Sequence, residues 1–149
     1  MIKRIGIFGD SWGCGVWDNI NDEYRVSHMG INHYLYRDNF HSINFSRPGS
    51  CNNENLENLK RYNQNFDIKI FIVTEPFRDF YYDPQQYNSN NTFENNCKNI
   101  VNSQLSEIET LCGESCMVIG GLHKINTDRK FIYCVNWCEL IDSETDWPV

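Results

Sequence analysis

The stretch IKIFIV at residues 68–73 is the clearest strand in the chain and decides the fold class. A nearly continuous apolar run of this length, without alternation, is typical of a strand whose two faces are both buried. Such strands belong to parallel sheets, which are covered on both sides by helices. Pro76 follows shortly afterwards and ends the strand, because proline has no N–H to donate to a sheet.

Four shorter strands and three helices are predicted around this strand. The strands are expected at residues 5–8, 42–45, 116–121 and 131–135, and the helices at residues 29–37, 53–62 and 93–111. Ser27 is expected to cap the first helix. Strands that alternate with helices connect by right-handed crossovers. The sequence therefore predicts a single α/β domain over residues 1–149, a three-layer α/β/α sandwich around a mainly parallel five-stranded sheet.

Two segments of this predicted fold are expected to lack regular structure. Residues 12–26 read as a long polar connection, and residues 77–91 (FRDFYYDPQQYNSNN) as an aromatic loop.

The composition excludes several classes of protein. The 149 residues carry a net charge of −7, so a wide phosphate-binding surface is disfavoured and no nucleic acid is expected as a partner. No segment has the apolar length of a signal peptide or a membrane span. Seven cysteines include two pairs spaced as C-x-x-x-C, which buried thiols explain better than zinc. We expect a protein of the cytoplasm, a reducing compartment, without metal, nucleotide or other cofactor.

Polar residues gather where the predicted strands end. These ends are Asp10 with Ser11, then residues 46–52, 74–78, 120–123 and 136–137, and four of the five carry Gly, Ser, Asn, His or acidic residues. Turn residues alone explain one or two such clusters. In open parallel sheets, ligands bind at the carboxyl ends of the strands. The sequence therefore predicts a ligand site along this edge.

Two short motifs stand at the first two of these ends. IFGDS at residues 7–11 closes the first strand, and NFSRPGSCN at residues 44–52 follows the second. With these motifs the chain resembles the SGNH (GDSL-like) hydrolases. That family has a flavodoxin-like α/β/α fold and removes acyl groups from esters, often on carbohydrates or lipids. The resemblance covers most of the chain by the order of its elements, and the two motifs carry it specifically.

The resemblance implies roles for several residues. Ser11 would be the nucleophile, and its backbone N–H and that of Gly49 would bind the oxyanion. Asp10 and Asn52 belong to the same two motifs and are included in the predicted substrate site, while Trp12 would form a wall of the pocket. Elementary chemistry agrees, since glycine lets the backbone approach a substrate closely and paired N–H donors stabilise a tetrahedral intermediate. The alternative for Ser11 is a helix-cap or turn serine.

The third block of the family, Gly-x-Asn-Asp, is not present. The corresponding stretch reads VTEPFRD at residues 73–79. If Glu75 takes the place of the asparagine, its charge opposes the oxyanion by about 4 kcal/mol at about 4 Å and an effective dielectric of about 20. Glu75 would then be protonated, turned away, or offset by Arg78. Alternatively, Thr74 donates through its hydroxyl, or Glu75 orients a histidine.

The fourth block, Asp-x-x-His near the C-terminus, is also missing, because no histidine follows residue 135. The same spacing at residues 38–41 precedes the second strand, at the edge of the sheet opposite Ser11, roughly 15 Å away. His33 and His41 are therefore expected to be structural. His123 follows a pair of glycines at a strand end and is the first candidate for the base, with His28 as the second. A surface histidine in a loop is an equal alternative for His123.

The sequence leaves two functions open. The first is a serine esterase or deacylase that acts on a small acyl ester, with carbohydrate esters among the substrates. The second is a catalytically degenerate domain that binds a small ligand or a protein partner, and the aromatic segment suits either. Cys14 and Cys51 fall in the two motif loops and are alternative nucleophiles. A further alternative is that the chain lacks a C-terminal segment that would bring the missing histidine.

Overall fold

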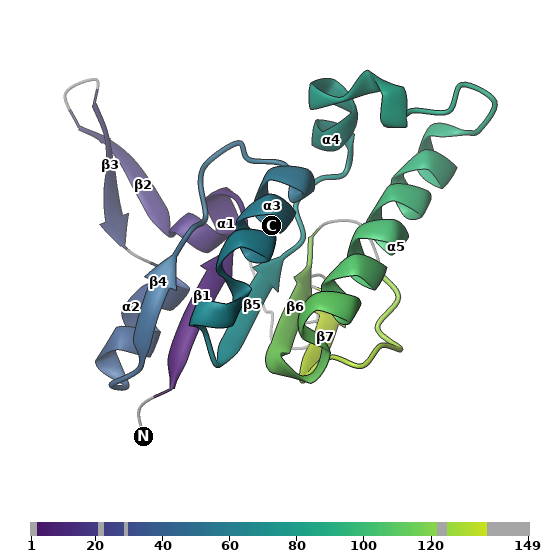
Figure 1. Cartoon of the computed structure of the whole chain (residues 1–149). Helices are drawn as coiled ribbons and strands as arrows, with labels where there is room; N and C mark the ends of the chain where they lie inside the picture. The colour runs from purple at the N-terminus through teal and green to yellow at the C-terminus, as the bar shows by residue number, and fades with distance from the viewer. Residues whose placement is uncertain (1–2, 21–22, 29, 122–124, 137–149) are drawn as a thin grey trace, which may run out of the picture.

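A computed structural model describes residues 3–20, 23–28, 30–121 and 125–136, with residues 16–20 and 23–28 described by their backbone alone. Five strands form one sheet in the order β4-β1-β5-β6-β7, and every neighbouring pair is parallel. The strands are β1 (Arg4–Phe8), β4 (His41–Asn44), β5 (Ile68–Ile72), β6 (Cys116–Gly120) and β7 (Tyr133–Asn136). Figure 1 shows β1, β5 and β6 at the centre of the sheet.

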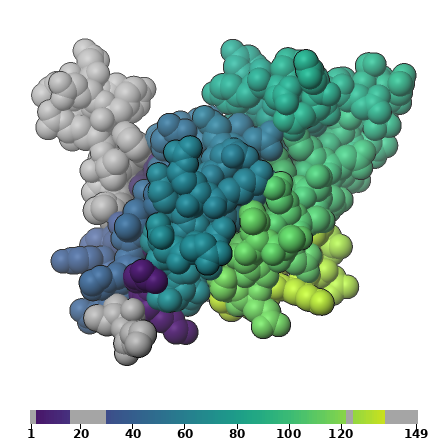
Figure 2. All heavy atoms as spheres, in the orientation of Figure 1, coloured from purple at the N-terminus to yellow at the C-terminus, as the bar shows by residue number. Residues whose placement is uncertain are grey.

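Three helices cover the two faces of this sheet. They are α2 (Ile31–Arg37), α3 (Asn52–Tyr62) and α5 (Phe93–Cys112). The helices α3 and α5 contact each other and pack on one face of the sheet, and Figure 2 shows the atoms of the two segments next to each other at the surface. The helix α2 packs on the other face and contacts β4. The predicted α/β/α sandwich with a five-stranded sheet is confirmed, and its sheet is wholly parallel.

Alternation along the strands divides the core between the two faces. Odd-numbered residues of β1 and even-numbered residues of β5 face α2, while Phe8 and Phe71 face α3 and α5. The larger cluster joins the sheet to α3 and α5 through Phe8, Leu56, Leu59, Phe71, Val101, Leu105, Ile108 and Val118. The smaller cluster consists of Ile5, Ile7, Ile70 and Ile72, with Ile31 and Leu35 of α2 packed against it.

The predicted polar connection at residues 12–26 is wrong. Its first part is the short helix α1 (Ser11–Cys14), and the rest is an antiparallel hairpin of β2 (Val16–Ile20) and β3 (Glu23–His28). In EYRVSH at residues 23–28, Tyr24 and Val26 alternate with polar residues, which is the period of a strand. Ser27 and His28 therefore belong to β3, and Gly30 stands at the N-cap of α2 instead.

The predicted aromatic loop is also wrong in its first half. Residues Phe77–Tyr82 form the helix α4, and Pro84–Gln86 form a single 3₁₀ turn. Pro76 stands at the N-cap of α4 with φ −66°, an angle already suited to a helix start. Phe77, Tyr81 and Tyr82 are exposed, whereas Phe80 is buried.

The remaining elements agree with the sequence to within two residues, and short 3₁₀ turns at Asn63–Asn65 and Gly113–Ser115 precede β5 and β6. Among the residues that the structure describes, no helix has the length and apolar character needed to cross a membrane.

The larger core cluster predicts a large loss of stability on truncation. Leu59 has no exposed surface and packs between α3 and the sheet. Leu59→Ala is expected to lower the free energy of unfolding by about 2–5 kcal/mol, because it removes apolar contacts and leaves a cavity. Urea denaturation followed by circular dichroism measures this change. Ile132→Ala, at a side chain that is 49% exposed, is the control and should change it by less than about 0.5 kcal/mol.

Candidate functional site

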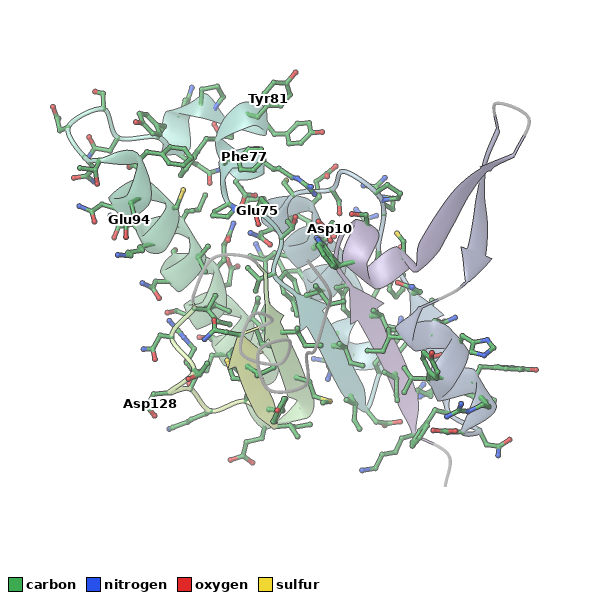
Figure 3. The ribbon with its side chains drawn as sticks, turned by 180° about the vertical axis from the view of Figure 1, so that it is seen from behind. Asp10, Glu75, Phe77, Tyr81, Glu94 and Asp128 are labelled. Carbon is green, nitrogen blue, oxygen red and sulfur yellow. The ribbon has the colours of Figure 1, made fainter. Side chains whose placement is uncertain are left out.

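The first strand ends in a turn that Asp10 organises. The N–H of Trp12 donates to Asp10 Oδ1 at 3.0 Å, and the N–H groups of Gly13 and Cys14 both donate to the Asp10 carbonyl oxygen at 3.1 Å. These bonds wind residues 11–14 into α1 and place Ser11 at its first position. Figure 3 shows Asp10 at the carboxyl end of the sheet, with Glu75 at the same level and Phe77 and Tyr81 beyond them on α4.

The other oxygen of the Asp10 carboxylate joins the first strand to β5 and α4. Asp10 Oδ2 accepts from Thr74 Oγ1 at 2.6 Å and from Arg78 Nη1 at 2.8 Å. Arg78 Nη1 also lies 2.9 Å from Thr74 Oγ1 and 3.3 Å from the Ser50 carbonyl oxygen. Asp10 has no exposed surface, so the guanidinium compensates a charge that has lost its water. Arg78 is thus a partner of Asp10, and the hydroxyl of Thr74 already donates to the same carboxylate.

The loop between β4 and α3 lies against the end of β1. The Arg47 N–H and Ser50 Oγ both donate to the Gly9 carbonyl oxygen, at 3.1 and 2.9 Å. Asn44 Nδ2 donates to the Gly13 carbonyl oxygen at 2.7 Å, and a side chain at Gly13 would collide with Ser46. The α1 turn and the loop that carries Gly49 are therefore held beside each other.

Gly49 has a backbone angle that favours glycine. Its φ is +76°, and a Cβ placed there would meet no atom within 4 Å. The glycine is thus required by its conformation and not by a crowded neighbour.

Asn52 closes the connection between this loop and the end of β5. Its Oδ1 accepts from the Thr74 N–H at 2.8 Å, and its Nδ2 donates to the Thr74 carbonyl oxygen at 3.1 Å. The side chain is 1% exposed, so its amide holds β5 to the start of α3.

Asp79 is a buried acid that the sequence analysis did not single out. Its Oδ1 accepts from the Asn53 N–H at 2.9 Å, and its Oδ2 accepts from the side-chain amides of Asn52 and Gln104 at 3.3 and 3.2 Å. This carboxylate lies at the N-terminus of α3, where the helix dipole favours negative charge. Asp79 and its neighbour Phe80 are the buried residues of α4.

Three groups at this edge have no hydrogen-bond partner in the described part of the chain and are not buried: the Ser11 hydroxyl, the Ser11 N–H and the Gly49 N–H. Ser46 Oγ also has no partner there, but it is buried. Ser11 is partly exposed, and the neighbouring Trp12 side chain is 55% exposed. A hydroxyl and two N–H donors are therefore accessible to a ligand beside an acid that is fully engaged.

The structure describes the side chains of two of the four histidines, His33 and His41. His41 begins β4 and pairs with Arg4, at the end of the sheet opposite Ser11, which confirms that the Asp-x-x-His spacing at residues 38–41 lies at the wrong edge. His33 lies on α2 against the ring of Tyr34. His123 lies outside the described residues, and His28 is described only as the last backbone position of β3.

The glycines before His123 have a packing explanation. A Cβ at Gly121 would lie 2.5 Å from the Val73 carbonyl oxygen, and one at Gly120 would lie 3.1 Å from Asn136 and Ile125. The close approach that these glycines suggested is therefore an approach of β6 to its own neighbours.

The thiols in the two motif loops are poor nucleophiles. Burial, with a smaller contribution from the Asp10 charge, raises the pKa of Cys14 to about 11. Burial also raises the pKa of Cys51 to about 11, and its side chain is 1% exposed at the N-cap of α3. At pH 7 only about one such thiol in ten thousand is a thiolate, whereas reactive cysteines have lowered pKa values.

Comparisons with known proteins add the following. No protein-family model matches the chain, and no curated protein matches it. The lipase/acylhydrolase from Enterococcus faecalis is similar in structure, with 13% identity and a TM-score of 0.44 over 83% of this chain and 60% of that chain. Protein YxiM from Bacillus subtilis is similar with 15% identity and a TM-score of 0.45 over 81% of this chain and 32% of that chain. This chain thus spans less than two thirds of the length of each of these two known proteins.

The Asp10–Arg78 pair predicts a coupled loss of stability. Arg78→Ala leaves the buried carboxylate without its cation and is expected to lower the free energy of unfolding by about 2–3 kcal/mol, less than for a fully buried pair because the Arg78 side chain is 25% exposed. Asp10→Asn in the same chain should recover at least about 1 kcal/mol of that loss. Urea denaturation of the two single variants and the double variant measures the coupling.

Arg37→Ala is the matched control for this pair. Arg37 and Asp38 are 62% and 56% exposed in their side chains, so their removal should have almost no effect. Strict additivity of Asp10→Asn and Arg78→Ala would contradict the account of the buried pair.

The raised pKa of Cys14 predicts slow alkylation. At pH 8 a thiol of pKa about 11 holds about a hundredfold less thiolate than an unperturbed thiol of pKa 9.0, so Cys14 should react with iodoacetamide about a hundredfold more slowly than a cysteine in a short peptide. Its rate should keep rising to about pH 11. Mass spectrometry of the modified peptide measures the rate, and a plateau below pH 9 would contradict the raised pKa.

Proposed function

We propose that the protein is a serine hydrolase of acyl esters with Ser11 as its nucleophile. The observation that carries the proposal is the state of Ser11, whose hydroxyl and N–H have no partner in the described part of the chain while the adjoining Asp10 is fully bonded. A serine that only capped a helix would use its hydroxyl on backbone N–H groups, and here Asp10 performs that function for α1. The two motifs shared with the SGNH hydrolases support the same role.

The reaction follows from these groups. Ser11 Oγ attacks the carbonyl carbon of the ester, and its proton passes to an imidazole base. The negative charge that forms on the carbonyl oxygen is bound by the N–H groups of Ser11 and Gly49. The imidazole then protonates the leaving alcohol, and an acyl group stays on Ser11. In the second half the imidazole takes a proton from water as the water oxygen attacks the acyl carbon, and it returns this proton to Ser11 Oγ as the carboxylic acid leaves.

The base is proposed to be His123, with His28 as the alternative. A serine hydroxyl is too weakly acidic to attack at neutral pH without one. His28 is the last residue of β3, and His123 follows β6, which ends at Gly120 on the same edge of the sheet as Ser11.

The ester hydrolysis is expected to be slow, because few hydrogen-bond donors are available to bind the oxyanion. The hydroxyl of Thr74 and the amide of Asn52 are bonded to Asp10 and to the backbone of Thr74, so neither replaces the asparagine of the family's third block. Loss of one oxyanion donor typically lowers kcat by about 10²–10³. The substrate is proposed to be a small acyl ester, with carbohydrate esters included, because exposed Trp12, Phe77 and Tyr81 offer apolar surfaces near the site.

A second candidate is a catalytically degenerate domain that binds a ligand or a protein at the same edge. The observation that favours it is the position of His41, which lies at the end of the sheet opposite Ser11 although it carries the Asp-x-x-His spacing.

Hydrolysis of p-nitrophenyl acetate and butyrate separates the two candidates. Ser11→Ala is expected to lower kcat/KM at least about a thousandfold, because the nucleophile is removed, and Ser103→Ala on the exposed side of α5 is the matched control. His123→Ala and His28→Ala identify the base by which of them has a comparable effect. Labelling of Ser11 by a fluorophosphonate, located by mass spectrometry, is the second readout.

The outcomes differ clearly between the candidates. Activity that survives Ser11→Ala would contradict Ser11 as the nucleophile. Absence of both hydrolysis and labelling in the unmodified protein would overturn the hydrolase proposal in favour of the binding domain.

A further inference from the structure

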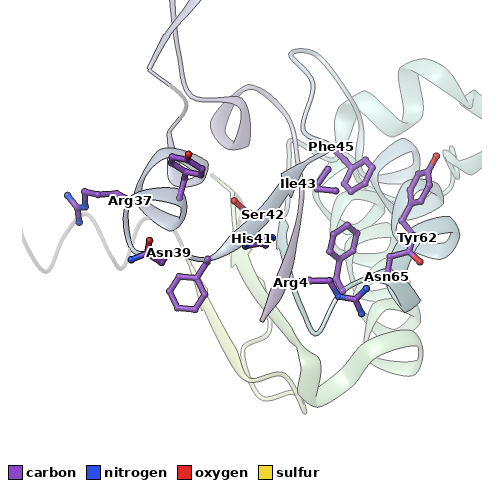
Figure 4. Close-up of a pocket in the computed structure, with 12 residues that line it drawn as sticks. Arg4, Arg37, Asn39, His41, Ser42, Ile43, Phe45, Tyr62 and Asn65 are labelled. Carbon is purple, nitrogen blue, oxygen red and sulfur yellow. The ribbon is translucent and has the colours of Figure 1, made fainter. Parts of the chain in front are cut away.

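A second site lies away from Ser11, along the strand at the edge of the sheet. A pocket of about 1000 Å³ follows β4 and is lined by Arg4, Arg37, Phe40, Ile43, Phe45 and Tyr62, among others. Figure 4 shows these side chains on both sides of β4, with Arg37 on one side and Ile43, Phe45 and Tyr62 on the other. We call it the edge pocket. It lies apart from the proposed hydrolase site, because Arg4 begins β1 whereas Ser11 follows its end.

The outer edge of β4 offers main-chain hydrogen bonds. The Phe45 N–H donates to the Ile7 carbonyl oxygen at 2.8 Å. Since the backbone groups of a strand point alternately to its two sides, the N–H and C=O groups of Ile43 also point toward β1. The N–H and C=O groups of Ser42 and Asn44 must therefore face outward. No strand pairs with this edge among the residues that the structure describes, and no hydrogen bond there reaches these backbone groups.

The side chains beside this edge form an uncovered apolar surface. Ile43 is 55% exposed and Phe40 is 37% exposed. Phe45 stacks between Phe8 and Tyr62 at ring-centroid distances of 5.0 and 4.8 Å, which gives the pocket a rigid aromatic wall. An extended peptide places alternate side chains on one face, so a strand beside β4 would bury apolar residues on this wall.

The charged residues that line the edge pocket indicate which kind of peptide it would bind. Its lining includes Arg4, Arg37 and His41 and contains no acidic side chain, although the whole chain has a net charge of −7. Asp67 and Asp38 pair with the two arginines at 3.7 and 3.2 Å, but these pairs are exposed on both sides and exchange readily with other anions. The local field thus favours a peptide with carboxylates.

A second copy of the chain fits this edge poorly. Pairing of β4 with the β4 of another copy would bring together two chains of charge −7 and two edge pockets that both lack acidic side chains. We propose that the open edge of β4 and the edge pocket bind an extended acidic segment of a partner protein, which adds to the five-stranded sheet as a further strand.

Model peptides of alternating sequence test this inference. Fluorescein-labelled EVEVEV is the probe, KVKVKV is its control of equal length and strand propensity, and fluorescence anisotropy measures the dissociation constant. We expect EVEVEV to bind at least about tenfold more tightly than KVKVKV. Methylation of alternate backbone nitrogens should weaken EVEVEV about tenfold or more, because it removes the donors that a strand needs.

Substitutions in the protein locate the peptide. Ile43→Glu should weaken EVEVEV at least about tenfold, because it places a like charge on the apolar wall. The matched control is Ile132→Glu, at a side chain of similar exposure that precedes β7 at the other edge of the sheet. Circular dichroism and urea denaturation show that both variants fold. Ser11→Ala should bind EVEVEV unchanged, which keeps this test separate from that of the hydrolase.

Several results would overturn the proposal. They are the absence of EVEVEV binding at millimolar concentration, equal binding of the N-methylated peptide, and equal binding by Ile43→Glu and the unmodified protein. A preference for KVKVKV would overturn the acidic character of the partner.

Discussion

The buried carboxylate of Asp10 is the interaction on which the carboxyl edge of the sheet depends. One oxygen winds α1, and the other receives Thr74 at the end of β5 and Arg78 on α4. A charge without exposed surface is tolerated only when its partners are complete. Asp10 therefore connects the α1 turn, which begins with Ser11, to Thr74 and Arg78, which lie 64 and 68 residues further along the chain.

This constraint separates the polar residues of the edge into two groups. Thr74, Asn52 and Arg78 are occupied with one another, with Asp10 or with backbone, so they build the site without being available to a ligand. Ser11 and Gly49 have N–H groups that no described residue uses. Four of the five strand ends carry Gly, Ser, Asn, His or acidic residues in the sequence, but at Asp10, Asn52, Thr74 and Arg78 the polar side chains bond to the chain itself.

The sequence was sufficient to predict those helices and strands whose apolar residues form a regular pattern because they are buried. The apolar runs at β5 and β6 and the helical spacing of α5 were placed to within two residues, because burial on both faces or along one stripe leaves a continuous signal. The hairpin and α4 were missed since their aromatic residues are mixed with polar ones. At α4 Phe80 is buried but Phe77, Tyr81 and Tyr82 are exposed, so the pattern of burial along this helix is weak.

The candidate site was less predictable for a different reason. That Ser11 and Gly49 share an edge follows from the parallel order of the strands, which the sequence indicated. That Arg78 pairs with Asp10 does not follow from the sequence, because the two side chains are 68 residues apart in the chain and only the folded structure brings them together. The use of Asn52 as a clamp on Thr74 depends in the same way on where α3 begins, and no local pattern records that contact.

Asn44 connects the two sites that the structure suggests. Its backbone groups lie on the outer edge of β4, whereas its side-chain amide donates to Gly13, two residues after Ser11, at 2.7 Å. A strand added at β4 would fix the backbone of Asn44, and the same residue holds the turn that carries the serine. Contiguity of this kind is a physical requirement for coupling between two sites, but coupling itself needs a second arrangement of the turn that both ligands bias. The short α1 turn, bonded to Asp10 on one side and to Asn44 on the other, is the element in which such an arrangement would have to exist.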